Sequence, residues 1–303
     1  MDLSIIIPSY NASGTLGDSL RSIERQVASL NSPCHYEIIV VDCSDDDSVE
    51  TLVAGKRRVI FIRRAVRFSP GEGRNIGASR ATGKLLMFID ADVILDSSAL
   101  NSAWHFYQQG NGLFGGALEL NEKHNPTIAS YLEHYFFNHE SQPKRPICER
   151  ANLSSALMVV ERKLFLAAGG FLDIPRMQDT EITERLRRQG VCLKFAPSVI
   201  GFQIQDSPMQ KVLKKIFING QNLYSIRYRK DMTRTKKVLF LMLLPSFALF
   251  KVLRIIGRQL RYQNLRRRCI TLLLVPLLFL SGFFWMLGFY NGILFNRGIS
   301  QQR

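Results

Sequence analysis

The sequence has few cysteines, and their arrangement argues against the usual cysteine chemistry. The five cysteines of the 303-residue chain are odd in number, scattered, and without the paired spacing of a zinc site. They suit a reducing compartment, and we expect no catalytic role for them. The beginning of the chain lacks the pattern of a cleavable signal peptide, because Asp2 precedes only a short apolar run. Both features favour a soluble part that faces the cytosol.

Acidic residues are scarce in the C-terminal part of the chain. The formal net charge is +15, and from Lys211 onward Lys and Arg dominate while Asp and Glu almost vanish. Such an asymmetry indicates nucleic acid or an anionic membrane surface as a partner. The apolar segments beside these basic residues favour the membrane. No nucleic-acid-binding motif is recognisable, so we expect no nucleic-acid partner.

The stretch from Lys84 to Asp92 joins a buried strand to two carboxylates. Its apolar run is short enough for a strand that is buried on both faces of a parallel sheet, and Asp90 and Asp92 follow directly. An unpartnered buried carboxylate is unfavourable, so this pair at a sheet edge indicates a bound cation or ligand. A hard divalent metal or a ribose suits such oxygens. Alternatively, Asp92 or Asp96 caps a helix that begins near Ser97.

Strand and helix patterns alternate around that stretch. Strands are expected at residues 3–7, 37–41 and 59–62, with helices between them, which is typical of a parallel sheet that binds ligands at the carboxyl ends of its strands. Asp42 ends the second strand, where it can accept hydrogen bonds from a base or ribose. Arg74 and Asn75 lie at a helix start, which favours an anion such as phosphate.

The middle of the chain is harder to interpret. Strands are expected at 113–120 and 154–160, and a helix at 125–138 has an aromatic face that indicates core packing. Three histidines in this region have spacings that fit no standard pair of metal ligands. Further on, Asp179 lies in the first turn of an expected helix, where a carboxylate is favoured by the helix dipole and serves either as a cap or in catalysis.

Four motifs in this order resemble those of the family 2 glycosyltransferases of GT-A fold. They are Ser4–Asn11, Ile38–Asp42, Gly73–Gly77 and Phe88–Asp92, and the resemblance extends roughly over residues 3–205. It implies an α/β fold in which a Rossmann-like, mostly parallel sheet is flanked by helices. It also implies a nucleotide-diphosphate sugar as donor, with uridine as the default base.

The resemblance also assigns roles to individual residues. It implies that Asp42 faces the nucleobase, and that Asp90 and Asp92 hold the ribose and a Mn or Mg ion on the diphosphate. The remaining nucleotide-sugar contacts would come from Pro8, Tyr10, Asn11, Arg74 and Asn75. Where the family often has a second acidic residue and a glycine after the second strand, this chain has Cys43 and Ser44.

Asp179 matches the second member of an acidic pair in the family, which acts as general base on the acceptor hydroxyl in inverting transfer. Gln178 replaces the first member and would orient that hydroxyl. As an ordinary carboxyl, Asp179 should titrate well below neutral pH and be ionised for this role.

The C-terminal third is expected to meet a membrane. We predict a catalytic domain at 1–207, a basic amphipathic interfacial helix at 208–237 and a membrane region at 238–303. The uncharged run that begins at Ile270 is long enough to span at about 270–292. The segment at about 238–256 is shorter and carries Lys251 and Arg254, and a full span there would place a basic loop outside. An interfacial or re-entrant segment is therefore preferred, with a two-helix hairpin as the alternative.

These features predict a membrane-associated bacterial enzyme, its catalytic domain facing the cytoplasm, that adds one sugar to a lipid or lipid-linked glycan. Processive relatives carry a Gln-x-x-Arg-Trp motif that residues 221–225 do not reproduce. Two alternatives stay open. A sugar-nucleotidyltransferase resembles others of its class in a glycine-rich basic loop after the first strand, which is not found here. A non-catalytic membrane scaffold that binds nucleotide-sugar is compatible with Gln178.

Overall fold

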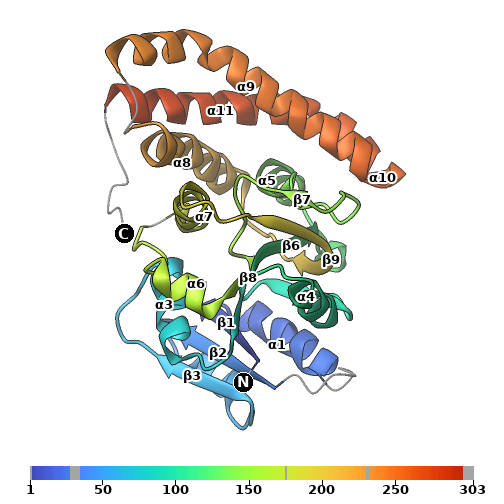
Figure 1. The fold of residues 1–303 in the computed structure, drawn as a ribbon. Coiled ribbons are helices and arrows are strands. Elements are labelled where there is room, and N and C mark those ends of the chain that lie inside the picture. Colours follow the sequence, from blue (N-terminus) through green and yellow to red (C-terminus); the bar gives the residue numbers. More distant parts are fainter. Residues whose placement is uncertain (1, 28–34, 175, 230–232, 296–303) are drawn as a thin grey trace. The chain divides into compact units, whose positions relative to one another are not determined.

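The computed structural model describes residues 2–27, 35–174, 176–229 and 233–295 (Figure 1). The chain divides into two compact units. Unit 1 comprises Met1–Glu119, Pro146–Asp173 and Gln178–Ile204, and unit 2 comprises Leu120–Arg145, Ile174–Met177 and Gln205–Arg303. Residues 230–232 of the predicted interfacial helix, and Cys34, lie outside the described residues. The end of unit 1 lies near the predicted domain boundary, but residues 120–145 belong to the C-terminal unit.

One half of the sheet in unit 1 is parallel, as the alternating pattern predicts. Strands β1, β2, β3 and β4 all run in the same direction, with β1 between β2 and β4. All five residues of β4 are buried, which explains its unbroken apolar sequence. Their bounds are β1 Leu3–Ser9, β2 Tyr36–Asp42, β3 Val59–Arg63 and β4 Leu85–Ile89, connected through helices α1 Ser13–Val27, α2 Ser48–Val53 and α3 Pro70–Arg80.

The other half of the sheet is antiparallel, so the sheet is mixed. In the described part of the chain the strand order is β3-β2-β1-β4-β8-β6-β9-β5, with β7 paired to β9. The sequence does not reveal this change of direction, because buried strands of either direction read as apolar runs. The bounds are β5 Val93–Leu95, β6 Leu113–Leu120, β7 Cys148–Glu149, β8 Leu157–Glu161 and β9 Lys194–Gln203, with helices α4 Ala99–Gln108, α6 Arg162–Ala167 and α7 Gln178–Arg188.

Two apolar clusters cover the two faces of this sheet. Along β1, Ile5 and Ile7 belong to one cluster and Ile6 belongs to the other, as the alternation of side chains along a strand requires. The first cluster includes residues of α1 and α4, and the second includes residues of α3, α6 and α7. The faces of the sheet are therefore filled, and polar chemistry is confined to the ends of its strands.

Unit 2 is a helical unit around its own apolar core. Helices α5, α8, α9 and α11 contribute most of the buried residues of this core, and Ile270 of α10 packs against it while only partly buried. Their bounds are α5 Ile128–Asn138, α8 Met209–Arg227, α9 Arg234–Tyr262, α10 Leu265–Leu273 and α11 Val275–Leu294, and a short 3₁₀ helix, η1, covers Glu122–His124.

The bounds of these helices differ from the segments that the sequence predicts. Helix α9 extends beyond the expected segment at 238–256 and passes through Lys251 as one helix of 29 residues. The ammonium group of Lys251 lies over the rings of Phe136 and Trp285, 4.6 and 5.0 Å from their centroids, so the charge is accommodated without ending the helix. Conversely, the uncharged run after Ile270 is not one helix, because α10 ends at Leu273 and α11 begins anew with a proline in its first turn.

Helices α8 and α11 approach each other closely at glycines. A Cβ atom at Gly288 would lie 1.9 Å from the carbonyl oxygen of Phe217, and one at Gly220 would lie 2.0 Å from that of Trp285. The indole of Trp285 also donates to Asn219 Oδ1 at 3.2 Å. The apolar side of α8 is thus buried in the core of unit 2, with Val212 and Ile216 both 0% exposed, and α8 is not a free interfacial helix.

Two helices in the described residues are long and apolar enough to cross a membrane, Thr235–Tyr262 and Val275–Leu294. Figure 1 shows α9 and α11 running side by side in unit 2. Large apolar side chains are exposed on both, among them Leu239, Met242 and Phe250 on α9 and Phe283 and Leu294 on α11. Length and composition therefore do not favour α11 over α9 as the single spanning segment.

A Gly288→Ala substitution should destabilise unit 2. The new methyl group has no room between α11 and the backbone of α8, and overpacking of this kind costs about 1–3 kcal/mol. Gly257→Ala is the matched control, because nothing lies within 4 Å of a Cβ at this glycine of α9. We expect a lower midpoint of thermal unfolding in detergent for the Gly288 variant alone; equal behaviour of the two variants would contradict the close contact.

Candidate active site

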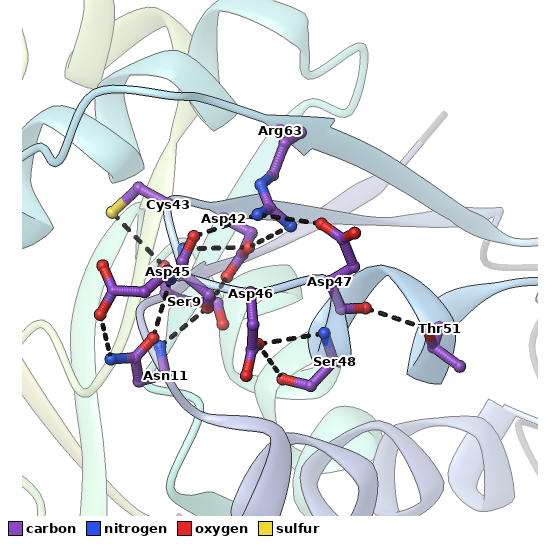
Figure 2. Close-up of polar contacts among 11 residues, drawn as sticks. Ser9, Asn11, Asp42, Cys43, Asp45, Asp46, Asp47, Ser48, Thr51 and Arg63 are labelled. Carbon is purple, nitrogen blue, oxygen red and sulfur yellow. Dashed lines mark hydrogen bonds and ion pairs between the residues drawn. The ribbon is translucent and has the colours of Figure 1, made fainter.

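The carboxyl ends of β1 and β2 form a polar network around Asp42 (Figure 2). The side chain of Asp42 is 0% exposed, and its two oxygens accept from the Ser44 hydroxyl at 2.6 Å and the Ser44 backbone N–H at 3.1 Å. Arg63, on β3, is the strand partner of Asp42, and its Nη1 atom lies 3.6 Å from Asp42 Oδ2. Arg63 also donates to the Ser44 carbonyl at 3.1 Å and pairs with Asp47 at 3.3 Å. The buried Asp42 side chain thus holds the turn after β2 in place through its hydrogen bonds.

The groups that this turn exposes come from the ends of both strands. The side chain of Asn11 donates to Asp45 Oδ2 at 2.7 Å and accepts from the Asp45 backbone N–H at 3.0 Å, while its own backbone N–H donates to Ser44. The hydroxyl of Tyr10 donates to the same Asp45 carboxylate at 3.1 Å. The guanidinium of Arg67 lies 4.1 Å from the centre of the exposed Tyr10 ring. A flat aromatic surface with a cation and an acceptor is suited to a planar base.

Arg74 and Asp90 form an ion pair at the end of β4. The Arg74 side chain is only 3% exposed, whereas that of Asp90 is 32% exposed. The guanidinium of Arg74 also lies 5.6 Å from the ring centre of Phe171. The sequence predicts that Arg74 neutralises phosphate, and in the structure its guanidinium pairs with Asp90. Arg74 thus pairs with one carboxylate of the Asp90–Asp92 pair.

The side chain of Asn75 forms two hydrogen bonds with the backbone of another segment. Its side chain donates to the Phe171 carbonyl at 2.8 Å and accepts from the Phe171 backbone N–H at 2.9 Å. Gly170 lies beside it with φ of +68°, and a Cβ there would lie 2.5 Å from Asn75 Oδ1. In the structure Asn75 thus fixes the chain after α6, and its predicted nucleotide contact stays a prediction. Elsewhere on α3, Gly73 permits close packing against Pro8 of β1, whose Cβ would lie 3.2 Å from an added Cβ.

Asp179 comes to this group of charges from the start of α7. One of its oxygens accepts from the Thr180 backbone N–H at 2.7 Å and the other from that of Ser155 at 3.4 Å. Burial raises the pKa of this carboxyl above its ordinary value, and the charge of Arg74 opposes the rise while that of Asp90 adds to it. These electrostatic contacts bring residues 74, 90 and 179 into one site. A carboxylate with a raised pKa is a stronger base than an exposed one.

Gln178 and Asp92 complete the set that the sequence predicts. Gln178 is buried at 6% exposure, and its Cγ would lie 3.0 Å from a Cβ at Gly71, so glycine at position 71 makes room for it. Asp92 accepts from the Gln203 side chain at 3.4 Å, and its carbonyl accepts from the Ile204 backbone N–H at 2.9 Å. Asp90 and Asp92 thus lie one residue apart just after β4, where their carboxylates are bonded to Arg74 and to Gln203.

Sequence reasoning missed four residues of this site. Arg63, Ser44, Asp45 and Arg67 carry the network below and around the base-sized surface, yet none belongs to a recognised motif. A signal existed for Arg63, because in a parallel pair the residue that ends β3 lies beside the residue that ends β2. Nothing local marks Asp45, whose partners lie 34 and 35 positions earlier in the chain.

The fold and its charged strand edge define a glycosyltransferase of GT-A type. Residues 4–165, more than half of the chain, match the model of glycosyl transferase family 2, and the chain belongs to this family. The family match favours sugar transfer over the sugar-nucleotidyltransferase alternative.

Relatives in sequence are glycosyltransferases. The chain is 33% identical over 114 residues to a poly(ribitol-phosphate) beta-glucosyltransferase of Bacillus spizizenii, covering 36% of this chain and 18% of that protein. It is 27% identical over 122 residues to the GalNAc(5)-diNAcBac-PP-undecaprenol beta-1,3-glucosyltransferase of Campylobacter jejuni, covering 38% of each. The matched stretch spans less than a third of the first curated relatives, at 18% and 29% of their lengths.

Solved structures share the fold. S. aureus TarS 1-349 in complex with UDP-GlcNAc superposes with a TM-score of 0.54 at 15% identity, covering 98% of this chain and 92% of that one. The mannosyltransferase PcManGT from Pyrobaculum calidifontis, solved with GDP-Man and Mn²⁺, gives a TM-score of 0.61 at 14% identity, covering 97% and 88%. At these identities the likeness shows the fold alone.

Proposed function

We propose that this glycosyltransferase moves one sugar, with inversion, from a nucleotide-diphosphate sugar to a hydroxyl of a lipid or lipid-linked glycan. The observation that carries the proposal is the group formed by Asp179 and the Arg74–Asp90 ion pair. A partly buried carboxylate of raised pKa interacts there with the ion pair at the end of β4, and this supports the proposal. A hydroxyl acceptor needs a base of this kind to lose its proton as it attacks.

Each residue of the group has a distinct role in this reaction. Asp179 takes the proton from the attacking hydroxyl, and single displacement inverts the anomeric carbon. Arg74 pairs with Asp90, and its charge limits the rise of the Asp179 pKa that burial causes. Gln178, adjacent to Asp179, orients the acceptor hydroxyl but cannot take its proton.

The nucleotide lies, in this proposal, over the exposed surface that Tyr10, Asn11 and Pro8 line. Asp42 acts on the base indirectly, since it is buried and fixes Ser44 and the turn that carries Asp45. Uridine stays the default base by family resemblance. Structural neighbours were solved with UDP-GlcNAc and with GDP-Man, so both uridine and guanosine donors deserve testing.

A divalent metal fits the strand edge. The described residues contain no group of three or more His, Cys, Asp or Glu side chains arranged for a metal, but two carboxylates suffice for an ion that shares ligands with a diphosphate and water. Asp90, 32% exposed, and Asp92 would hold Mn or Mg. When bound, the ion would offset negative charge on the departing nucleotide diphosphate. Two structural neighbours were solved with Mn²⁺.

The acceptor is proposed to be presented by the membrane, with the catalytic domain on the cytoplasmic side. Two apolar helices in unit 2 support membrane association, and one relative is named for a lipid-linked substrate. Addition of a single sugar follows from the departure from the processive motif. The non-catalytic scaffold is the remaining alternative, and it predicts nucleotide binding without sugar release on any acceptor.

The donor site can be tested by thermal stabilisation of the detergent-purified chain. UDP, GDP, CDP and dTDP are added with and without Mn to the wild type, to Asp92→Asn and to the control Asp96→Asn, whose carboxylate accepts from Ser98. At a hundredfold excess over its Kd, a ligand stabilises by about 2.7 kcal/mol, a shift of a few degrees. We expect one nucleotide to act only with Mn, and only the Asp92 variant to lose the effect. No response to any nucleotide would overturn the donor assignment.

A further inference from the structure

Five basic side chains gather within unit 2, away from the residues of the active site in sequence. They come from three elements: Arg145 follows α5, Arg227 ends α8, and Lys251, Arg254 and Arg258 lie on α9. Their charges act on one another, and the single carboxylate among them is that of Glu140. We call these residues the basic cluster. Like charges that interact repel one another, so the cluster is unfavourable unless an anion offsets its charge.

The carboxylate of Glu140 is already committed within the cluster. It forms an ion pair with Arg258, and the Glu140 backbone carbonyl accepts from Arg145 at 2.7 Å. The neighbouring His139 accepts from the same Arg258 guanidinium at 2.9 Å and is buried at 5% exposure. Burial and the surrounding cations hold the pKa of His139 well below its ordinary value, so it is neutral and balances no charge.

Lys251 and Arg254 are left facing aromatic rings. The Lys251 ammonium lies over Phe136 and Trp285, and the Arg254 guanidinium lies 5.8 Å from the ring centre of Phe250. Among the residues that the structure describes, no carboxylate forms an ion pair with either cation. Such ring contacts hold a cation in place but leave its charge available to an anion.

An exposed apolar surface leads directly to these cations. On α9, Phe247, Leu249 and Phe250 are 41%, 49% and 64% exposed, and the first cation of the cluster is the next residue, Lys251. Leu253, 51% exposed, continues the surface between Lys251 and Arg254. Apolar side chains followed by cations match a lipid, whose acyl or prenyl chains end in a phosphate at the membrane boundary.

We propose that the basic cluster binds the phosphate or diphosphate group of a membrane lipid, whose chains lie along the exposed face of α9. Lys251 and Arg254 make the charged contacts, and Arg258 with Arg145 positions Glu140 and the loop beside them. The site lies wholly within unit 2 and does not depend on Asp179. Loss of sugar transfer would therefore leave lipid binding intact, and the two proposals fail independently.

The test measures binding of short-chain phosphatidic acid, polyprenyl phosphate and inorganic pyrophosphate to the full chain in detergent by calorimetric titration. Lys251→Gln/Arg254→Gln is compared with Lys211→Gln/Lys214→Gln, which removes the same charge from exposed positions at the other end of α8. We expect the first variant to weaken lipid-phosphate binding about tenfold or more, because a single charge-assisted hydrogen bond to phosphate accounts for about a factor of ten in affinity. The control should change the affinity less than about twofold, as expected for screened surface charges.

Lys251→Arg/Arg254→Lys keeps both charges and should bind as the wild type does. Normal binding by this variant would show that the charges, and not an unfolded protein, account for the loss. The single Arg254→Gln variant changes an exposed position and serves the same purpose. Equal weakening by the cluster and control variants would overturn the proposal, because it would show general attraction to a basic surface. Pyrophosphate binding as tight as lipid binding would overturn the lipid and show a soluble anion instead.

Discussion

Replacement of Asp179 by asparagine is expected to lower kcat about a thousandfold while nucleotide binding persists. The substitution keeps the shape and the contact with the Thr180 backbone N–H but removes the group that takes the proton from the acceptor. General base catalysis contributes about 10²–10⁴-fold to enzymatic rates. In the wild type, kcat should fall as the pH is lowered through the raised pKa of Asp179, because the base must be ionised.

The same substitution should stabilise the fold at neutral pH. Burial raises the pKa of Asp179 in the folded chain, and a carboxyl whose pKa is higher when folded stabilises the fold only below its unfolded pKa. That contribution is lost as the pH rises through the folded pKa, so the ionised carboxylate opposes folding at pH 7. Asparagine removes this effect, with a gain of about 1 kcal/mol, as is common where a functional group is buried.

These two readouts together distinguish a base from a helix cap. The control is Glu181→Gln, which removes a carboxylate from the same helix turn and its ion pair with Arg185. We expect the Glu181 variant to keep its activity within a few-fold and to lose a little stability. An Asp179→Asn protein that is active within tenfold of the wild type and less stable would show that Asp179 serves only as a cap.

Arg74→Met is expected to lower both stability and activity. The guanidinium is 3% exposed and ion-paired to Asp90, so its removal leaves that carboxylate without a cation and removes the contact with Phe171. Breaking one partner of a buried pair costs about 3–5 kcal/mol, and the partial exposure of Asp90 places the expected loss near 3 kcal/mol. Removal of the Arg74 charge also raises the pKa of Asp179 further, which moves the acid limb of the activity profile to higher pH.

A double-mutant cycle with Asp90→Asn isolates the pair. In the Arg74→Met/Asp90→Asn protein no carboxylate is stranded, so part of the stability should return, with a coupling free energy of about 1–3 kcal/mol from denaturant unfolding. Additive losses would mean that Arg74 stabilises the chain by packing alone. Activity should not return in the double variant, because Asp90 is also proposed to contact the donor.

Much of unit 1 could be predicted from local patterns. The five-residue apolar run of β4, followed by Asp90 and Asp92, and the amphipathic pattern that places Asp179 at the start of α7 both depend on neighbours along the chain. The polar residues between β2 and α2 likewise predict a turn. Local periodicity sets these elements, and the structure confirms them at or near the expected bounds.

What could not be predicted depends on partners far away in the sequence. Asn75 hydrogen-bonds the backbone of Phe171, 96 positions later, a contact that its motif does not reveal. Asp42 is buried and its partners are Ser44, beside it in the chain, and Arg63, 21 positions later, which the motif alone does not reveal. Helix α9 passes through Lys251 because rings from α5 and α11 receive the ammonium group, an arrangement that no local pattern encodes.

The glycine contact between α8 and α11 can form only after α11 has been synthesised. Helix α8 leaves the ribosome before α11, whose Gly288 and Trp285 lie against the α8 backbone near Phe217 and Gly220. Until α11 is synthesised, α8 can pack against α5 but lacks this close contact. A chain that stops before Gly288 therefore leaves α8 without the packing contact that α11 provides.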